Sequence, residues 1–298
     1  MAMLTGSLVA LITPMSTDGE IDWPTLDKLL EWHIQEGTRG IIAMGTTGES
    51  ATLDTDEHLQ VIKRCIEVVD QRIPVVAGTG SNSTAEAIHQ TKEAARLGAD
   101  ACLVVTPYYN RPTQEGLVHH FKAIAAVSDL PVILYNVPPR TGCDMLADTV
   151  ARLAEVDRIV GIKDACGDAE RVKLIRDRVD DDFYILSGED AQTMRMMELG
   201  AVGTISVTAN VLPKAMSEFC ARYLSGDKAS SAQIDAVLQS VHDILFVESS
   251  PTPTKWILAD KGLIEGGIRL PLIPLSTQHH ETVRQRITAA EAELKAVI

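Results

Sequence analysis

The chain has 298 residues, of which 45% are hydrophobic and 23% charged, and its formal net charge is −14. This composition is typical of a globular protein, and the acidic balance argues against nucleic acid and anionic membranes as partners, because both require a basic face. The five cysteines are scattered and form no C-x-x-C pair, as expected for reduced thiols. No apolar run approaches the roughly 18 residues of a membrane span, and residues 1–5 lack the features of a signal peptide. We therefore expect a cytoplasmic protein.

Short apolar runs alternate with longer amphipathic stretches along most of the chain. The short runs lack strict period-two alternation, which predicts strands that are buried on both faces, as in parallel sheets. The predicted strands are residues 7–13, 40–44, 74–77, 101–106, 131–135, 159–163, 183–187 and 203–207. The predicted helices between them are residues 24–35, 56–69, 85–96, 114–127, 148–154, 169–178 and 191–199.

Eight strands that each precede a helix predict an α/β protein with a (β/α)8 TIM barrel. The alternative is an open doubly wound sheet, which usually carries G-x-G-x-x-G after its first strand, and no such loop follows here. After residue 207 only helices are predicted, at residues 212–224, 231–246, 254–261 and 281–297. We expect a catalytic barrel of residues 1–225 and a C-terminal helical appendage of residues 226–298, with three helices packed on the barrel.

The residues that follow the predicted strands matter most, because barrel active sites lie at the C-terminal ends of the strands. Strand two leads into G-T-T-G-E at residues 45–49, where amides and hydroxyls could hold a carboxylate, although an ordinary glycine-rich turn fits equally well. Three of the five tyrosines, Tyr108, Tyr109 and Tyr135, fall on the same rim. Arg140 follows two prolines, and a guanidinium on such a loop can bind a carboxylate through two hydrogen bonds. A site for a small anionic substrate is predicted.

Lys163 ends the sixth predicted strand. Burial would disfavour its ammonium form and lower its pKa, which frees an amine that can attack a carbonyl. A salt-bridged lysine is the alternative for such a position. Of eleven lysines, only this one ends a barrel strand, since the others fall in predicted helices or in the C-terminal region. With the threonines, tyrosines and arginine of the same rim, it favours imine chemistry on a keto acid.

Metal sites and hydrolase triads have little support in the sequence. The eight histidines include no H-x-H or H-E-x-x-H, there is no G-x-S-x-G, and no phosphate-binding loop occurs. The histidines are interpreted as surface residues, and we expect neither a metal nor a cofactor.

The motifs at residues 45–49, 135–142 and 161–164 resemble the dihydrodipicolinate synthase (4-hydroxy-tetrahydrodipicolinate synthase) family of pyruvate-dependent class I aldolases, and the resemblance runs from about residue 6 to residue 274. It implies a lyase that condenses pyruvate with L-aspartate 4-semialdehyde in diaminopimelate and L-lysine biosynthesis. The alternative is N-acetylneuraminate lyase or a related sugar-acid aldolase. Arg140 favours the synthase, because those lyases lack an arginine there. A non-catalytic keto-acid-binding protein is a third possibility, which the intact Lys163, Tyr135 and Thr47 set speaks against.

The resemblance also implies a role for individual residues. Lys163 would form the Schiff base with pyruvate, and Tyr135, Thr47 and Tyr109 would relay protons. In this family the tyrosine equivalent to Tyr109 crosses a dimer interface, so each site would need a neighbouring subunit. The usual assembly is a homotetramer, a dimer of dimers.

Substrate contacts and an inhibitor site are implied in the same way. The expected substrate-binding residues are Thr46, Thr47, Arg140, Gly188 and Ile205. The threonines would hold the pyruvate carboxylate and the arginine the semialdehyde carboxylate, while Gly188 and Ile205 would line the pocket through their backbone. Many bacterial members are inhibited by L-lysine, and the matching positions here are Ser50, Ala51, His58, Asn82, Glu86 and Tyr108. The chain departs from one lysine-sensitive pattern at Thr55, which stands in place of a histidine. L-lysine inhibition is nevertheless predicted.

Overall fold

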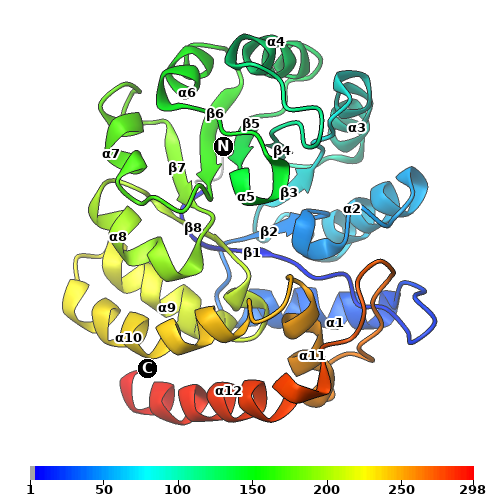
Figure 1. The fold of residues 1–298 in the computed structure, drawn as a ribbon, viewed down its shortest axis with the longest axis vertical. Helices are drawn as coiled ribbons and strands as arrows, with labels where there is room; N and C mark the ends of the chain where they lie inside the picture. The colour runs from blue at the N-terminus through cyan, green and yellow to red at the C-terminus, as the bar shows by residue number, and fades with distance from the viewer. Residues whose placement is uncertain (1–3) are drawn as a thin grey trace.

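The computed structural model describes residues 4–298 of the chain. Within this range eight parallel strands form a closed barrel in which each strand pairs with the next and β8 pairs with β1 (Figure 1). The strands are β1 (Gly6–Ala10), β2 (Gly40–Ala43), β3 (Val75–Gly78), β4 (Ala101–Val105), β5 (Val132–Asn136), β6 (Ile159–Asp164), β7 (Tyr184–Ser187) and β8 (Gly203–Ser206). The predicted (β/α)8 barrel is therefore confirmed.

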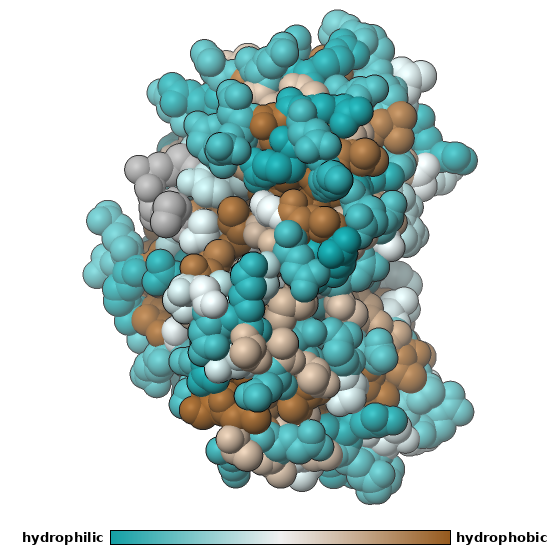
Figure 2. All heavy atoms as spheres, turned by 90° about the vertical axis from the view of Figure 1, so that its left-hand side faces the viewer, coloured by the Kyte–Doolittle hydropathy of each residue, from teal (hydrophilic) through white to brown (hydrophobic). Residues whose placement is uncertain are grey.

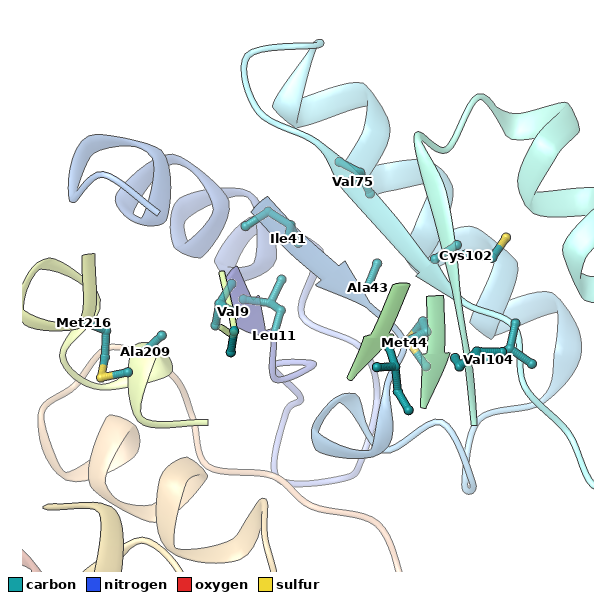
Figure 3. Packing of buried hydrophobic residues seen from close by; sticks show 14 of the residues in the cluster. Val9, Leu11, Ile41, Ala43, Met44, Val75, Cys102, Val104, Ala209 and Met216 are labelled. Carbon is teal, nitrogen blue, oxygen red and sulfur yellow. The ribbon is translucent and has the colours of Figure 1, made fainter. Parts of the chain in front are cut away.

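Successive side chains of each strand point to opposite sides of the barrel wall, which explains why the strand sequences do not alternate in polarity. In β1, Leu8 and Ala10 belong to a cluster inside the barrel, whereas Val9 belongs to the larger cluster between strands and helices. Figure 3 shows part of this outer cluster, including Val9, Ile41 and Val75. Both sides of the wall are mostly apolar, although a few strand positions carry buried serine or threonine, and the charged side chain of Lys163 at a strand end stands out.

Helices surround the barrel (Figure 1). They are α1 (Trp23–Gln35), α2 (Thr55–Val69), α3 (Thr84–Leu97), α4 (Gln114–Ala125), α6 (Ala147–Ala154), α7 (Arg171–Arg176), α8 (Thr193–Glu198) and α9 (Pro213–Leu224).

The predicted and observed ends of the first strand differ at the C-terminal rim of the barrel. The first strand ends at Ala10 and not at residue 13, because the Ile12 amide donates to the Asn210 side chain at 3.0 Å instead of to a neighbouring strand.

Short helical turns that the sequence did not predict follow four strands at the C-terminal rim. They are the 3-10 turns η1 (Thr46–Gly48), η2 (Asp190–Gln192) and η3 (Thr208–Asn210), and the four-residue helix α5 (Pro138–Thr141). Segments of three or four residues are too short to show a helical period, so only the structure reveals them. Two of these turns carry Thr46, Thr47 and Arg140.

Three helices follow the barrel: α10 (Lys228–Ile244), α11 (Thr252–Asp260) and α12 (Thr277–Val297). They gather on one side of the barrel, and α10 packs against both α9 and α12 (Figure 1). The three predicted helices are confirmed, whereas the division between residues 225 and 226 stays a prediction. The prediction that residues 1–5 lack the features of a signal peptide includes residues 1–3, which lie outside the described residues.

The surface over α7, α8 and α10 is largely hydrophilic, and its apolar side chains occur in small separate groups (Figure 2). Among the helices of residues 4–298, none has the length and apolar character needed to cross a membrane.

Candidate active site

A pocket opens at the C-terminal ends of the strands, where the sequence places the candidate residues. Six of them line it together: Thr46, Thr47, Tyr135, Arg140, Lys163 and Gly188. Ile205 is buried in the cluster inside the barrel and is not among the lining residues, whereas Val207 is. The pocket also contains Glu189, Phe246 and Ser250, which sequence reasoning did not identify.

Lys163 and Tyr135 form the centre of the pocket. They are register partners on β6 and β5, so both side chains point into the barrel, and Lys163 Nζ lies 4.3 Å from the centre of the Tyr135 ring. Their exposed fractions are only 5% and 7%. Among the described residues, Lys163 has no carboxylate oxygen within the 4.0 Å that defines a salt bridge. The salt-bridged alternative for this lysine therefore finds no partner in residues 4–298.

The pKa values of this pair are shifted in opposite directions. Burial lowers the pKa of Lys163 from 10.5 to about 8, and Arg140 adds to the decrease, while the Asp190 and Glu189 carboxylates oppose it. Burial raises the pKa of Tyr135 to about 12, against the opposing influence of Arg140. Near neutral pH a useful fraction of the amine is therefore uncharged, while the phenol keeps its proton. A neutral amine beside a protonated phenol is suited to attack on a carbonyl.

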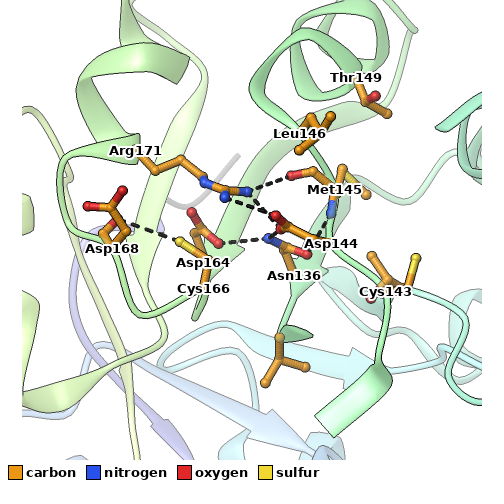
Figure 4. Close-up of polar contacts among 12 residues, drawn as sticks. Asn136, Cys143, Asp144, Met145, Leu146, Thr149, Asp164, Cys166, Asp168 and Arg171 are labelled. Atoms are coloured by element: carbon orange, nitrogen blue, oxygen red, sulfur yellow. Dashed lines mark hydrogen bonds and ion pairs between the residues drawn. The ribbon is translucent and has the colours of Figure 1, made fainter. Parts of the chain in front are cut away.

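A polar network lies behind the pocket, on the outer side of the strands (Figure 4). Asn136 and Asp164 directly follow the pocket tyrosine and lysine in the chain, so their side chains point outward. The Asn136 side-chain amide donates to Asp164 at 3.1 Å and to Asp144 at 2.9 Å, and Arg171 donates to both Asp144 oxygens at 2.7 and 2.9 Å. Burial raises the pKa of Asp164. The network joins the ends of β5 and β6 and so fixes the relative positions of the two pocket residues.

The turn that carries Thr46 and Thr47 is tightly held. The Thr13 hydroxyl donates to the Gly48 carbonyl at 2.7 Å, and a side chain at Gly48 would meet the Leu11 carbonyl oxygen at 3.2 Å. The turn ends at Glu49, whose amide donates to the Thr46 carbonyl at 3.1 Å. Thr47 is buried and Thr46 is exposed to the pocket mouth. The turn thus presents hydroxyl groups and backbone next to the lysine.

Arg140 is exposed and also lines the pocket. It lies on α5, which Pro138 begins and in which the Arg140 amide donates to the Val137 carbonyl at 3.0 Å. Among the described residues it has no salt-bridge partner, so its guanidinium can bind an anionic group of a ligand.

Tyr109 does not line this pocket within one chain. Its side chain is 90% exposed, and its backbone has a φ of +72°, an unusual conformation for a residue other than glycine. The Tyr109 amide donates to the Thr141 carbonyl at 3.3 Å, which ties its loop to the end of α5. The residue therefore projects outward from the rim.

Five of the six candidate L-lysine residues line a second cavity, which shares Thr46, Val137 and Arg140 with the first. Its lining includes Ser50, Ala51, His58, Glu86 and Tyr108, together with Thr55. Asn82 is not in this lining, but its side-chain amide donates to the Tyr108 carbonyl at 3.2 Å. Within residues 4–298 no group of three His, Cys, Asp or Glu side chains could hold a metal ion.

Comparisons with known proteins agree with this geometry. Residues 3–290 match the dihydrodipicolinate synthetase family. The chain is 55% identical over 283 residues to 4-hydroxy-tetrahydrodipicolinate synthase of Pseudomonas aeruginosa, which covers 95% of this chain and 97% of the relative. It is 52% identical over 288 residues to the synthase of Cellvibrio japonicus, covering 97% and 99% of the two chains.

Solved structures give the same result. A dihydrodipicolinate synthase from Acinetobacter baumannii, described as chloride inhibited and complexed with pyruvate, matches with a TM-score of 0.95 and 54% identity, covering 97% of this chain and 99% of that one. The enzyme from Cyanidioschyzon merolae with lysine bound matches with a TM-score of 0.93 and 37% identity, covering 96% and 98%. The chain therefore belongs to the dihydrodipicolinate synthetase family.

Proposed function

We propose that this chain is a 4-hydroxy-tetrahydrodipicolinate synthase, a class I aldolase-type lyase that condenses pyruvate with L-aspartate 4-semialdehyde, and that Lys163 is its nucleophile. One observation carries the assignment of the nucleophile: Lys163 is buried without a salt-bridge partner among the described residues, and its pKa is lowered to about 8. The five cysteines are free, and the proposed compartment is the cytoplasm.

The first stage forms an imine. The neutral Lys163 amine attacks the C2 carbonyl of pyruvate, and loss of water leaves a Schiff base between the lysine and C2. The Tyr135 phenol is the nearby proton carrier, since its hydroxyl keeps its proton at neutral pH. Thr46 and Thr47 hold the pyruvate carboxylate through their hydroxyl and amide groups, and Gly188 leaves room beside the lysine, where a Cβ would lie 3.0 Å from Lys163 Cε.

The second stage forms the carbon–carbon bond. Removal of a proton from C3 of the imine gives an enamine, and this carbon attacks the aldehyde of L-aspartate 4-semialdehyde. Arg140 at the pocket mouth holds the carboxylate of that substrate. The amine of the second substrate then displaces Lys163 from C2, which closes the ring and returns the free lysine.

The proton relay extends to a second subunit in this proposal. Tyr109 completes a triad with Tyr135 and Thr47 in the site of a neighbouring chain, and two such dimers make a homotetramer. The outward projection of Tyr109, with 90% of its side chain exposed in one chain, supports this role.

L-lysine is the proposed inhibitor, and it binds in the second cavity. There the Glu86 carboxylate would pair with an ammonium group, while Tyr108 in the lining and Asn82, which binds the Tyr108 backbone, would hold a carboxylate. The cavity shares Thr46 and Arg140 with the active site, so occupation of one could alter the other. Initial rates measured with L-lysine up to millimolar levels test this; rates that do not change contradict the regulation and leave the catalytic assignment intact.

A trapping experiment tests the catalytic assignment. The protein is incubated with pyruvate and borohydride, and the adduct is mapped by mass spectrometry. We expect one adduct, on Lys163. An adduct elsewhere would contradict the mechanism, and no adduct would favour a non-catalytic binder. Product formation from pyruvate with L-aspartate 4-semialdehyde, compared with pyruvate and N-acetylmannosamine, separates the synthase from a sugar-acid lyase.

A further inference from the structure

A buried ion pair joins the C-terminal helices to the turn that carries Thr46 and Thr47. Glu49 directly follows this turn, and Lys255 lies on α11. The two side chains form a salt bridge in which each is only 1% exposed. The second carboxylate oxygen of Glu49 accepts a hydrogen bond from the Arg269 amide at 3.0 Å. Both oxygens of Glu49 are therefore held by residues that are more than 200 positions away in the chain.

The C-terminal segment also reaches the active-site pocket itself. Phe246 and Ser250, which precede Lys255 in the chain, line the pocket together with Lys163. Arg269 binds the carboxylate of Glu57 at 2.6 and 2.7 Å and the carbonyl of Thr52 at 3.0 Å. Arg269 of the C-terminal region therefore binds both the loop between η1 and α2 and the first turn of α2.

The backbone conformation of Glu49 explains why its contacts with Lys255 and Arg269 matter for the turn. Glu49 has a φ of +62°, a left-handed conformation that costs free energy for a residue other than glycine. Its amide closes the turn on the Thr46 carbonyl, so a change in the Glu49 backbone changes the position of the threonine turn. Such a conformation persists where surrounding contacts hold it in place, and here Lys255 supplies the charged contact.

We propose that Lys255 is a positioning residue for the pyruvate carboxylate: by holding Glu49, it fixes the backbone of the turn Thr46–Gly48 at the side of Lys163. The inference rests on the proposed function, since it assumes that this turn binds the carboxylate. It gives the C-terminal helices a role in substrate binding in addition to packing. Lys261 provides a contrast, because its ion pair with Glu291 joins the end of α11 to α12 and does not involve the turn.

The test uses the full-length protein and the variant Lys255→Met. Without its cation the Glu49 carboxylate can no longer stay buried, and the turn shifts with it. We expect the KM for pyruvate to rise about tenfold, as for the loss of about one well-placed hydrogen bond, and the KM for the semialdehyde to stay within about twofold. Borohydride trapping at increasing pyruvate concentration should show the same rise in the half-saturating concentration. The matched control Lys261→Met should keep both KM values.

A double variant separates positioning from stability. Glu49→Gln with Lys255→Met removes both charges, so its melting temperature should recover toward that of the wild type, while its KM for pyruvate should stay raised. Recovery of both the melting temperature and the KM would show that the pair only stabilises the fold and would overturn the proposal, as would an unchanged KM in Lys255→Met. If Lys255→Met does not fold, the double variant alone decides. Absence of the adduct in the wild type would instead overturn the proposed function.

Discussion

Replacing Lys163 by methionine should abolish imine trapping and at the same time stabilise the protein. The buried ammonium is unfavourable: its pKa is about 8 in the folded chain, against 10.5 for an ordinary lysine. At pH 7 the lysine is mostly protonated in both the folded and the unfolded state, and the shift corresponds to about 3 kcal/mol of lost stability. The lost attraction between the ammonium and the Tyr135 ring, at 4.3 Å, offsets about 1 kcal/mol of the gain. We expect Lys163→Met to be about 2 kcal/mol more stable at pH 7.

The pH dependence of this gain has a definite sign. Between pH 8 and pH 10.5 the unfolded chain holds a proton that the folded chain has lost, so the wild type becomes more stable as the pH rises. The advantage of Lys163→Met should therefore shrink over this window.

The measurement is the melting temperature by differential scanning calorimetry, at pH 7 and at pH 10, for the wild type and two variants. The gain at pH 7 should be roughly 5 °C. The exposed Lys173 on α7 supplies the control, and Lys173→Met should melt like the wild type at both pH values. A variant at Lys163 that melts at or below the wild-type temperature at pH 7, or a gain that does not decrease at pH 10, would refute the reasoning.

Three further predictions concern catalysis. The rate of imine trapping at Lys163 should rise about tenfold per pH unit below pH 8 and level off above it, and a midpoint near pH 10 would contradict the lowered pKa. Tyr135→Phe should lower kcat by about 10²–10⁴-fold because the proton carrier is lost, while mass spectrometry should still map the trapped adduct to Lys163. Mixed dimers of Lys163→Met and Tyr109→Phe, refolded or co-expressed, should recover activity that neither variant has alone, because one site then receives both intact residues; no recovery would mean that Tyr109 does not cross between subunits.

Much of the fold and of the pocket was predictable from local sequence. The eight apolar runs define the barrel, and the rule that barrel sites lie at strand ends brings Lys163, Tyr135 and the threonine turn to one rim. These predictions need only the order of the strands. The short turns after four strands were not predictable, since three or four residues carry no period.

The residues that hold the site in place were harder to predict, because their partners are distant in the chain. In the sequence Lys255 looks like any other lysine of the C-terminal region, because its partner Glu49 lies 206 positions earlier. The contact between Asn136 and Asp164 depends on the register between β5 and β6, and sequence patterns do not predict that register. Tyr109 poses a different difficulty, since its proposed partner site belongs to another copy of the chain.

The alternation of side chains across the barrel wall has a consequence for protein engineering. Tyr135 and Lys163 point inward, whereas Asn136 and Asp164, one residue further along the same strands, bind each other on the outer side, where Asn136 also binds Asp144 and Asp144 binds Arg171. A library aimed at new acceptor aldehydes can therefore vary the loops around the pocket mouth while keeping the polar network of Asn136, Asp144, Asp164 and Arg171 unchanged. Random mutagenesis that changes this network would instead disturb the alignment of the Lys163 amine and the Tyr135 phenol without replacing either residue.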